Sequence, residues 1–299
     1  MDAFVALVVV LIIIAGVMGV LLYSQMTKEP HKSPDVLEVE ERDEIEFTYT
    51  GYLMNTLVFE TMIEDVAIDN DTYPKSLLFE WPEDGVFGAI PVTVGDGLPH
   101  YTFDGMVGNG EILEITMLGM QVNQTKSVVV HPEKGFGDVD PSKIVTLSLT
   151  ETRDIVETLS WSDFGNRFLV PPVVNGTVTD PIWGWDVRVT AAQQGPLGPE
   201  VTFLNLPEVG DIISPYLGFE SKVISVESGA NGGIGEITIE HLLDSNDVNK
   251  VMGDSPHEEG RFAVVGVNQA AGTFVADFNS EKASVDLLYE ITIVSITKS

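Results

Sequence analysis

An aromatic side chain held between two glycines is the feature of this sequence that points most directly to chemistry. Phe136 lies between Gly135 and Gly137 in "HPEKGFGDVDP", after the run "SVVV" of small or apolar residues and before a second proline, Pro141. Glycines on both sides allow backbone conformations that are closed to other residues, so the ring can be aimed at a definite target. Two interpretations follow from the local pattern: the ring is a wall of a ligand site, or it is a plug in an ordinary strand and loop.

Side chains suited to nucleophilic or metal chemistry are scarce. The chain has no cysteine, which excludes disulfides, thiolate nucleophiles, zinc ribbons and iron–sulfur clusters. Its five histidines lie far apart, without a pair at positions i and i+4: His31, His100, His131, His241 and His257. The sequence therefore predicts no cofactor and no metal site, and it leaves aromatic surfaces as the candidate binding chemistry.

The charge balance excludes one class of partner. The 299 residues include 46 Asp and Glu against 15 Lys and Arg, which gives a formal net charge of -31. A surface this anionic repels phosphate backbones and anionic headgroups, so we expect no nucleic-acid binding and no electrostatic docking on membranes. With 44% hydrophobic residues, the chain can build a packed core in one large or two modest domains.

Hydrophobic periodicity indicates the elements that must position these residues. Apolar and polar residues alternate in "DEIEFTYTGYL", "KSVVVHP", "EVTFLNL" and "DLLYEITIVSI", which predicts a mainly β fold with some α+β character. A helical period occurs around 110–120 and 152–168, where Ser160 is the expected N-cap of a short helix through "WSDF". "PIWGWDVRVT" from Pro181 resembles "PYLGFESKVI" from Pro215, and each precedes a strand, which indicates a duplicated β-hairpin.

The start of the chain predicts a membrane anchor. Phe4 to Tyr23 carries no charge, and twenty helical residues at about 1.5 Å each cross the roughly 30 Å hydrocarbon core. A cleavable signal peptide is the rival interpretation, but it needs a basic start and a small-x-small site, which are missing here. Two lysines after the span favour a cytoplasmic globular part. Three glycosylation-type triplets favour an extracytoplasmic one on the cell membrane, which is our expectation: Asn70-Asp71-Thr72, Asn123-Gln124-Thr125 and Asn175-Gly176-Thr177.

Ordered motifs between residues 49 and 141 resemble the FKBP-type peptidyl-prolyl cis-trans isomerases. That family shows Tyr-Thr-Gly, an aromatic-acid pair, Gly-x-Gly, a Gly-Met pair, Pro-Glu-x-x-Tyr-Gly and Asp-Pro. The counterparts occur here in the same order: Tyr49-Thr50-Gly51, Phe59-Glu60, Gly95-Asp96-Gly97, Leu118-Gly119-Met120, Pro132-Glu133, Phe136-Gly137 and Asp140-Pro141. Each motif is weak alone, but their shared order and close spacing make the resemblance specific.

A second block, "DFNSEKASVDLLYEITIVSI" (277–296), resembles the family's closing Asp-x-Asn-His-Pro-Leu-Ala-Gly motif and its last strand. Asp277, Asn279 and Ala283 are kept, and Tyr289-Glu290 stands at the Phe-Glu position. The long insertion is similar to that of the SlyD-like and long archaeal branch, whose insert-in-flap domain acts as a chaperone. The resemblance implies an FKBP-like antiparallel half-barrel sheet with a short helix and a large β-rich insertion. The expected segments are a tail and anchor (1–24), a linker (25–37), the first part of the isomerase-like domain (38–147), the insertion with the repeated hairpin (148–265) and the closing strands (266–299).

The activity implied by this resemblance is rotation about X-Pro bonds in proline-containing unfolded or nascent polypeptides. Rotation crosses a barrier of about 18–20 kcal/mol and needs no proton transfer, so an aromatic bowl that desolvates and twists the amide is sufficient. The implied catalytic residues are Tyr49, Phe59, Glu60, Leu113, Phe136 and Tyr289. The implied substrate-binding residues are Ile90, Val92 and Ile144.

Departures from the family keep alternatives open. Phe136 replaces a tyrosine whose hydroxyl donates to a substrate carbonyl, Glu60 replaces an aspartate, and the interval from Gly97 to Met120 is longer than in the family. The chain is either an active membrane-anchored isomerase with a chaperone insert, a catalytically degenerate binding module, or a docking subunit of a membrane protein complex. An open bowl favours the first, a groove confined to the insertion favours the second, and a bowl filled by residues 98–112 favours the third.

Overall fold

The computed structural model describes residues 37–299, apart from 55, 83–84, 99–102, 104–105, 107–109, 197 and 255–259. The predicted anchor, Phe4 to Tyr23, and all but the last residue of the linker lie outside the described residues. Within the described ranges, no helix is long and apolar enough to cross a membrane. Strands make up 45% of the structure and helices 11%, which confirms the predicted mainly β class.

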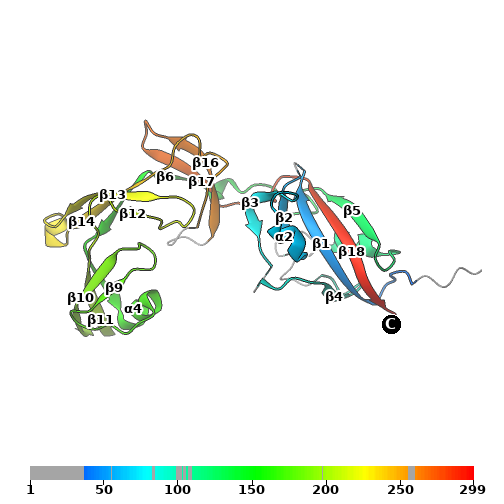
Figure 1. Ribbon diagram of the computed structural model, residues 1–299, viewed down its shortest axis with the longest axis horizontal. Helices are drawn as coiled ribbons and strands as arrows, with labels where there is room; N and C mark the ends of the chain where they lie inside the picture. The colour runs from blue at the N-terminus through cyan, green and yellow to red at the C-terminus, as the bar shows by residue number, and fades with distance from the viewer. Residues whose placement is uncertain are drawn as a thin grey trace, which may run out of the picture.

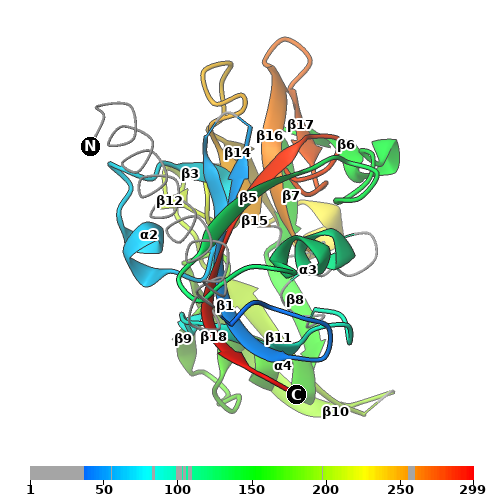
Figure 2. The same cartoon turned by 90° about the vertical axis from the view of Figure 1, so that its right-hand side faces the viewer.

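Two long antiparallel strands organise one end of the molecule, which we call the body (Figure 1). β1 (Glu44–Leu53) pairs along its length with β18 (Leu287–Thr297). The sheet order is β3-β2-β1-β18-β5, and β4 lies beside the first half of β1. Figure 2 shows this sheet curling into a half-barrel, with α3 near β5. The other elements of the body are β2 (Val58–Thr61), α2 (Glu64–Ile68), β3 (Lys75–Glu80), β4 (Ile90–Thr93), α3 (Glu111–Met117) and β5 (Thr125–Val130).

Alternation along the two long strands explains the core of the body. Ile45, Phe47 and Tyr49 of β1 are buried, as expected for a strand with one covered face. The same period on β18 buries Leu287, Tyr289, Ile291 and Ile293. Helix α3 closes this face of the sheet with Leu113 and Met117, both fully buried.

The chain between η3 (Pro141–Lys143) and β18 forms an arm of three four-stranded antiparallel sheets (Figure 1). We name the three units by their position relative to the body. The proximal unit contains β6 (Ile144–Ser148), β15 (Met252–Asp254), β16 (Arg261–Asn268) and β17 (Thr273–Asp277). The middle unit contains β7 (Thr150–Asp154), β12 (Ile212–Ile213), β13 (Ser221–Glu227), η4 (Asn231–Gly233) and β14 (Glu236–His241). The distal unit contains β8 (Val156–Ser160), α4 (Trp161–Phe168), β9 (Thr177–Thr179), β10 (Asp186–Gly195) and β11 (Gly198–Asn205).

The three units repeat one plan. Their strand orders correspond: β6-β17-β16-β15, β7-β14-β13-β12 and β8-β11-β10-β9. The long third strand of each unit has a β-bulge directly after a valine: Val189, Val223 and Val264. Each of these valines also exchanges two backbone hydrogen bonds with the residues just before the short edge strand of its unit, β9, β12 or β15, at 2.8 to 3.0 Å. The hairpins noted in the sequence are β10–β11 and β13–β14, and β16–β17 is a third copy.

The units are nested in the sequence. The stretch 144–160 supplies the first strand of all three units, and the chain then completes the distal, middle and proximal units in that order. Single residues join neighbouring units. Leu149 N–H donates to Gly272 O of the proximal unit, and Leu149 O accepts from His241 N–H of the middle unit, both at 2.8 Å. Ile155 makes the corresponding two bonds between the middle and distal units.

The predicted insertion boundaries at 148 and 265 fall inside the proximal sheet. The boundary at 265 divides β16, which pairs with β15 on one side and β17 on the other, so the proximal sheet contains strands from both the predicted insertion and the predicted closing segment. By hydrogen bonding, the arm runs from 144 to 277, and β18 is the strand that returns to the body.

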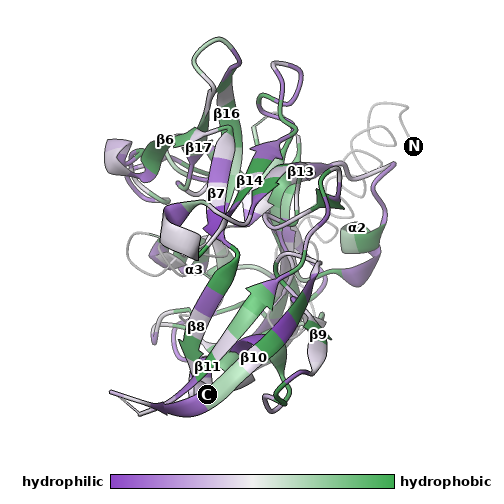
Figure 3. Ribbon diagram, turned by 90° about the vertical axis from the view of Figure 1, so that its left-hand side faces the viewer, coloured by the Kyte–Doolittle hydropathy of each residue, from purple (hydrophilic) through white to green (hydrophobic). Residues whose placement is uncertain are grey.

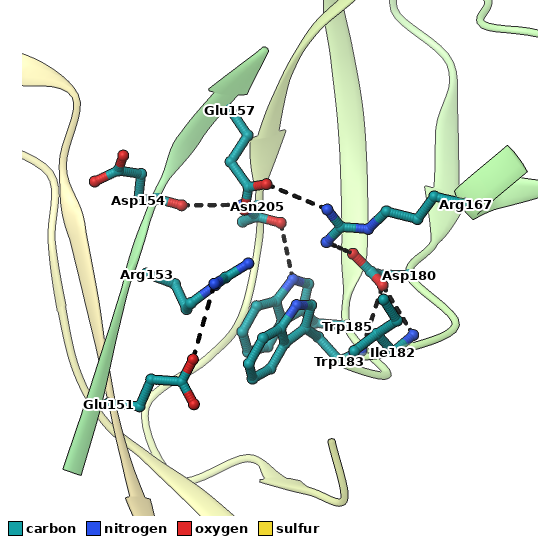
Figure 4. A network of polar contacts seen from close by, with 10 residues as sticks. All are labelled: Glu151, Arg153, Asp154, Glu157, Arg167, Asp180, Ile182, Trp183, Trp185 and Asn205. Carbon is teal, nitrogen blue, oxygen red and sulfur yellow. Dashed lines mark hydrogen bonds and ion pairs between the residues drawn. The ribbon is translucent and has the colours of Figure 1, made fainter. Parts of the chain in front are cut away.

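Aromatic loops connect each unit with the next one toward the body. Trp183 and Trp185 precede β10 and stack with ring centroids 5.2 Å apart, and the guanidinium of Arg153 in the middle unit lies 4.8 Å over the Trp183 ring (Figure 4). At the corresponding place before β13, Phe219 packs on Phe262 of the proximal unit at 6.4 Å. Aromatic side chains therefore couple the folding of neighbouring units.

Helix α4 covers the core of the distal unit. Ser160 is its N-cap, as predicted, and the Ser160 Oγ accepts a backbone N–H three residues further on at 3.1 Å. Phe164 and Phe168 are buried against Phe203 of β11, at 5.9 and 5.5 Å. The helix ends at Leu169, which has a left-handed backbone with φ 55°, at a position where glycine is the usual residue.

Side chains fix the proximal unit to the body at the edge of β3. Arg261 of β16 donates to the carbonyls of Leu78 and Phe79, both at 3.1 Å. Glu281 accepts hydrogen bonds from the Ser76 hydroxyl and, at 3.1 Å, from Leu78 N–H. These contacts satisfy the outer edge of β3, which would otherwise be open to another strand.

Candidate functional site

Three aromatic residues implied as bowl walls come together on adjacent strands of the body. Tyr49 on β1 and Tyr289 on β18 have ring centroids 5.9 Å apart, and Phe59 on β2 meets Tyr289 edge-on at 5.6 Å. Gly51 permits this approach, because a Cβ there would lie 2.4 Å from Phe59 Cζ. Leu113 of α3 belongs to the same buried cluster. We call the set Tyr49, Phe59, Leu113 and Tyr289 the aromatic bowl.

Not all of the remaining predicted residues lie beside this bowl. Ile90 is buried in the same cluster, and Val92 and Phe136 pack against it while half-buried. Gly137, next to Phe136, has φ 69°, as a glycine used to aim the loop requires. Ile144 lies elsewhere: it begins β6 of the proximal unit and is 41% exposed. The resemblance implied Ile144 as a substrate-binding residue, but η3 turns the chain into the arm just before it.

Glu60 is a buried acid at the wall of the bowl. The hydroxyl of Tyr289 donates to Glu60 Oε1 at 3.2 Å. Burial raises the pKa of Glu60 to about 7, although the ammonium of Lys282, 3.6 Å from Glu60 Oε2, opposes this rise. Burial, together with the neighbouring carboxylate of Glu60, raises the pKa of Tyr49 and Tyr289 well above the usual range, so both keep their hydroxyl protons at neutral pH.

Lys282 is a site residue that sequence reasoning missed. Its side chain is 7% exposed, and its Nζ lies 4.3 Å from the ring centroid of Phe136, 5.6 Å from that of Phe59 and 3.0 Å from Glu80 Oε2. Burial lowers its pKa, but the carboxylates of Glu60 and Glu80 outweigh burial, so the net pKa is raised and Lys282 stays charged. A signal was present: in the closing motif, Lys282 stands where the family has leucine. The bowl therefore has a cation at its rim.

Phe103 is the second residue that was missed, and it closes the bowl. Its ring lies 5.0 Å from Tyr49 and 6.1 Å from Tyr289, and it is 2% exposed. Leu98 and Met106 are buried in the same cluster. The four bowl residues are each at most 3% exposed, so a prolyl ring has no access to them in this state. The longer interval from Gly97 to Met120 was the sequence signal for this difference.

The arm offers a different kind of surface at the end of the distal unit. Leu169 is 84% exposed, and the next residues of the loop include three exposed valines, Val170, Val173 and Val174. Beside them lies a groove of about 250 Å³, lined by Phe164, Val170, Pro171, Val173, Gly176, Thr177, Val178 and Val189. Figure 3 faces this end of the molecule and shows hydrophobic and hydrophilic residues alternating along β8 and β10. The distal loop, residues 169–174, is therefore an exposed apolar surface beside a groove of side-chain size.

A second apolar segment, "PLGPEVTFLNLP", is not available for binding. Its central part forms β11, which is hydrogen-bonded to β8 on one side and β10 on the other. Val201 and Phe203 point into the core that α4 covers. The 169–174 loop is thus a more exposed apolar surface than this strand.

No family model matches the chain, and no curated protein matches it. Among the described residues, no group of three or more His, Asp or Glu side chains is placed to hold a metal ion. The candidate chemistry therefore consists of the closed aromatic bowl in the body and the apolar loop on the arm.

Proposed function

We propose that this chain is an FKBP-like polypeptide-binding protein that assists folding through its arm, while its aromatic bowl is closed to prolyl substrates. The observation that carries the proposal is the contrast between the two surfaces: the bowl residues are at most 3% exposed, whereas Leu169 of the distal loop is 84% exposed. Of the alternatives set by the sequence, the filled bowl agrees with a docking subunit and the groove in the insertion agrees with a binding module, and we favour the binding module because its groove lies beside an exposed apolar loop. Non-native, proline-containing chains remain the proposed partners.

The backbone at Leu169 supports a binding role for the distal loop. A leucine in the left-handed region costs more than a glycine or asparagine, and an exposed leucine gains nothing from the core. Leu169 thus combines a strained backbone with an exposed apolar side chain. It lies beside a groove that fits one or two apolar side chains, as a binding residue would. The net charge of -31 disfavours acidic partners, so we expect the bound segments to be apolar and neutral or basic.

Replacing Leu169 with asparagine should separate binding from stability. Asn tolerates the left-handed backbone, so the free energy of unfolding should rise by up to about 1 kcal/mol. Loss of an apolar contact worth about 1.5–3 kcal/mol should raise the concentration needed to suppress aggregation of an unfolded client roughly tenfold or more. Light scattering of the client and urea unfolding of the variant measure the two effects.

Val86→Asn is the matched control, because Val86 is 64% exposed on the body. This control should leave aggregation suppression unchanged. If Leu169→Asn suppresses aggregation as well as the wild type does, the distal loop is not the binding surface.

A membrane-anchored isomerase is the second candidate function, favoured by the convergence of Tyr49, Phe59 and Tyr289 in the body. The closed bowl leads us to expect that the wild-type chain does not accelerate cis-to-trans conversion of an X-Pro peptide. A protease-coupled or NMR exchange assay at micromolar protein tests this. A rate clearly above the uncatalysed one would favour the isomerase over the binding module.

The proposed location is the cell membrane, with the globular part outside and Phe4 to Tyr23 as the single-pass anchor. Asn70, Asn123 and Asn175, the asparagines of the three glycosylation-type triplets, are all exposed, as a glycosylated position requires. Participation in a membrane protein complex remains part of the proposal.

A further inference from the structure

We propose that Phe103 makes an autoinhibitory contact, and that the closed bowl is a latent prolyl-isomerase site which opens when this one ring leaves. This inference rests on the FKBP-like assignment in the proposed function and goes beyond it, because it assigns the bowl a second, regulated activity. No covalent bond forms or breaks in that activity; the amide C–N bond of the substrate rotates.

The Phe103 ring packs on the bowl from outside the sheet that carries two of its walls. It contacts two walls at once, Tyr49 at 5.0 Å and Tyr289 at 6.1 Å. Those two walls come from neighbouring strands of the sheet, whereas Phe103 comes from the connection between β4 and α3. A prolyl ring that reached the same two aromatic faces would have to replace Phe103.

The walls do not depend on Phe103 for their arrangement. Tyr49 and Tyr289 are held by the continuous pairing of β1 with β18, and Phe59 is held by the pairing of β2 with β1. The hydrogen bond from the Tyr289 hydroxyl to Glu60 adds a side-chain contact within the same wall. Removing the Phe103 ring should therefore open the bowl without dispersing its walls.

Close packing holds the Phe103 ring in the closed position. A Cβ at Gly110 would lie 2.9 Å from Leu98 Cδ1 and 3.5 Å from two atoms of the Phe103 ring. Gly110 also has φ 78°, a conformation that favours glycine. Leu98 and Phe103 thus pack directly on the start of α3, and the closure is a defined contact.

Lys282 supplies the donor that an open bowl needs. Phe136 has no hydroxyl for a substrate carbonyl, but the Lys282 ammonium lies 4.3 Å from the Phe136 ring centroid, at the rim. Its partner Glu80 holds it there at 3.0 Å. A charge-assisted hydrogen bond from Lys282 to the substrate carbonyl would stabilise the twisted amide in this apolar surrounding.

The experiment measures the isomerase rate of the full-length chain in detergent with Phe103→Ala and with the milder Phe103→Leu. We expect Phe103→Ala to accelerate X-Pro isomerisation roughly tenfold or more over the wild type at equal protein concentration, and Phe103→Leu to give a smaller gain. Phe136→Ala in the Phe103→Ala background should remove most of the gain. Phe274→Ala, which truncates a buried phenylalanine of the proximal unit, is the control and should gain nothing.

Circular dichroism melting shows whether each variant is folded. Background rates in folded Phe103→Ala and folded Phe103→Leu would overturn the proposal, and if Phe103→Ala fails to fold, background activity in Phe103→Leu overturns it alone. Aggregation suppression measured on the same samples is independent of the bowl. The Leu169→Asn variant therefore tests the proposed binding function, whereas the Phe103 variants test the latent isomerase activity.

Discussion

Replacing Trp183 with alanine should destabilise the arm by about 3–5 kcal/mol and leave the body folded. Trp183 is 1% exposed and stacks on Trp185 at an interplanar angle of 11° (Figure 4). Its other face carries the guanidinium of Arg153, which belongs to β7 of the middle unit. Truncation removes this aromatic contact from the junction and leaves a cavity between two units. Both effects destabilise the junction.

The polar network around the two tryptophans should lose its order in the same variant. Trp185 Nε1 donates to Asn205 Oδ1 at 2.9 Å, and Asn205 Nδ2 donates to Asp154 O at 3.0 Å, so one side chain joins the distal and middle units. Arg167 connects Glu157 with the buried Asp180. These hydrogen bonds and ion pairs lie beside the stacked rings. They are strong only while the rings keep water away from them.

Differential scanning calorimetry or urea unfolding measures the result as an early transition of the arm, separate from that of the body. Trp81→Ala is the matched control, because Trp81 is 57% exposed on the body and its removal should cost less than about 1 kcal/mol. If Trp183→Ala lowers both transitions equally, the arm and the body form one cooperative unit and the junction does not act locally.

Strand positions were predictable from sequence because each unit has one covered face and therefore a period-two pattern. The repeat was only partly predictable. "PIWGWDVRVT" and "PYLGFESKVI" share aromatic loops that enter the junction toward the next unit, but the third copy has "SPHEEG" at that place and lacks an aromatic residue. Its identity shows in the strand order, in the bulge after Val264 and in the pairing of β6 with β17.

The candidate site was predictable where it depends on strand pairing and not where it depends on a loop. Tyr49, Phe59 and Tyr289 meet because β1, β2 and β18 are neighbouring strands. The order of the motifs in the sequence indicates that these strands are neighbours. For the long interval from Gly97 to Met120, the sequence does not indicate which side chains pack on an apolar surface. Phe103 packs on the bowl itself, and no local pattern in the sequence indicates this contact.

Replacing Lys282 with methionine should destabilise the body in a pH-dependent way. Methionine keeps an apolar stem of similar length but removes the cation between Glu60 and Glu80. A charged Glu60 without this partner is a buried, uncompensated carboxylate, a state that costs about 3–5 kcal/mol. Glu60 avoids the cost by taking up a proton, and its pKa should rise further above 7 because Lys282 no longer lowers it.

The sign of the pH effect follows from the raised pKa of Glu60. Since the folded state holds the proton more tightly than the unfolded state, this stabilisation is complete below the ordinary carboxylate pKa and is lost as pH rises through the folded pKa. In the wild type, that loss begins near the ordinary carboxylate pKa and is complete just above pH 7. In Lys282→Met the loss continues to higher pH, so the difference between the two proteins should be small at pH 6 and should grow by about 1.4 kcal/mol per pH unit above pH 7.

Urea unfolding at pH 6 and pH 8.5 measures this difference, and Glu60→Gln in the Lys282→Met background supplies the control. Glutamine has the shape of protonated glutamate and cannot ionise, so the double variant should lose the additional pH dependence and recover stability at pH 8.5. A Lys282→Met penalty of equal size at both pH values would contradict the argument. It would mean that the Lys282 ammonium stabilises the rim of the bowl mainly through its contacts with the rings of Phe59 and Phe136, and not through its ion pair with Glu60.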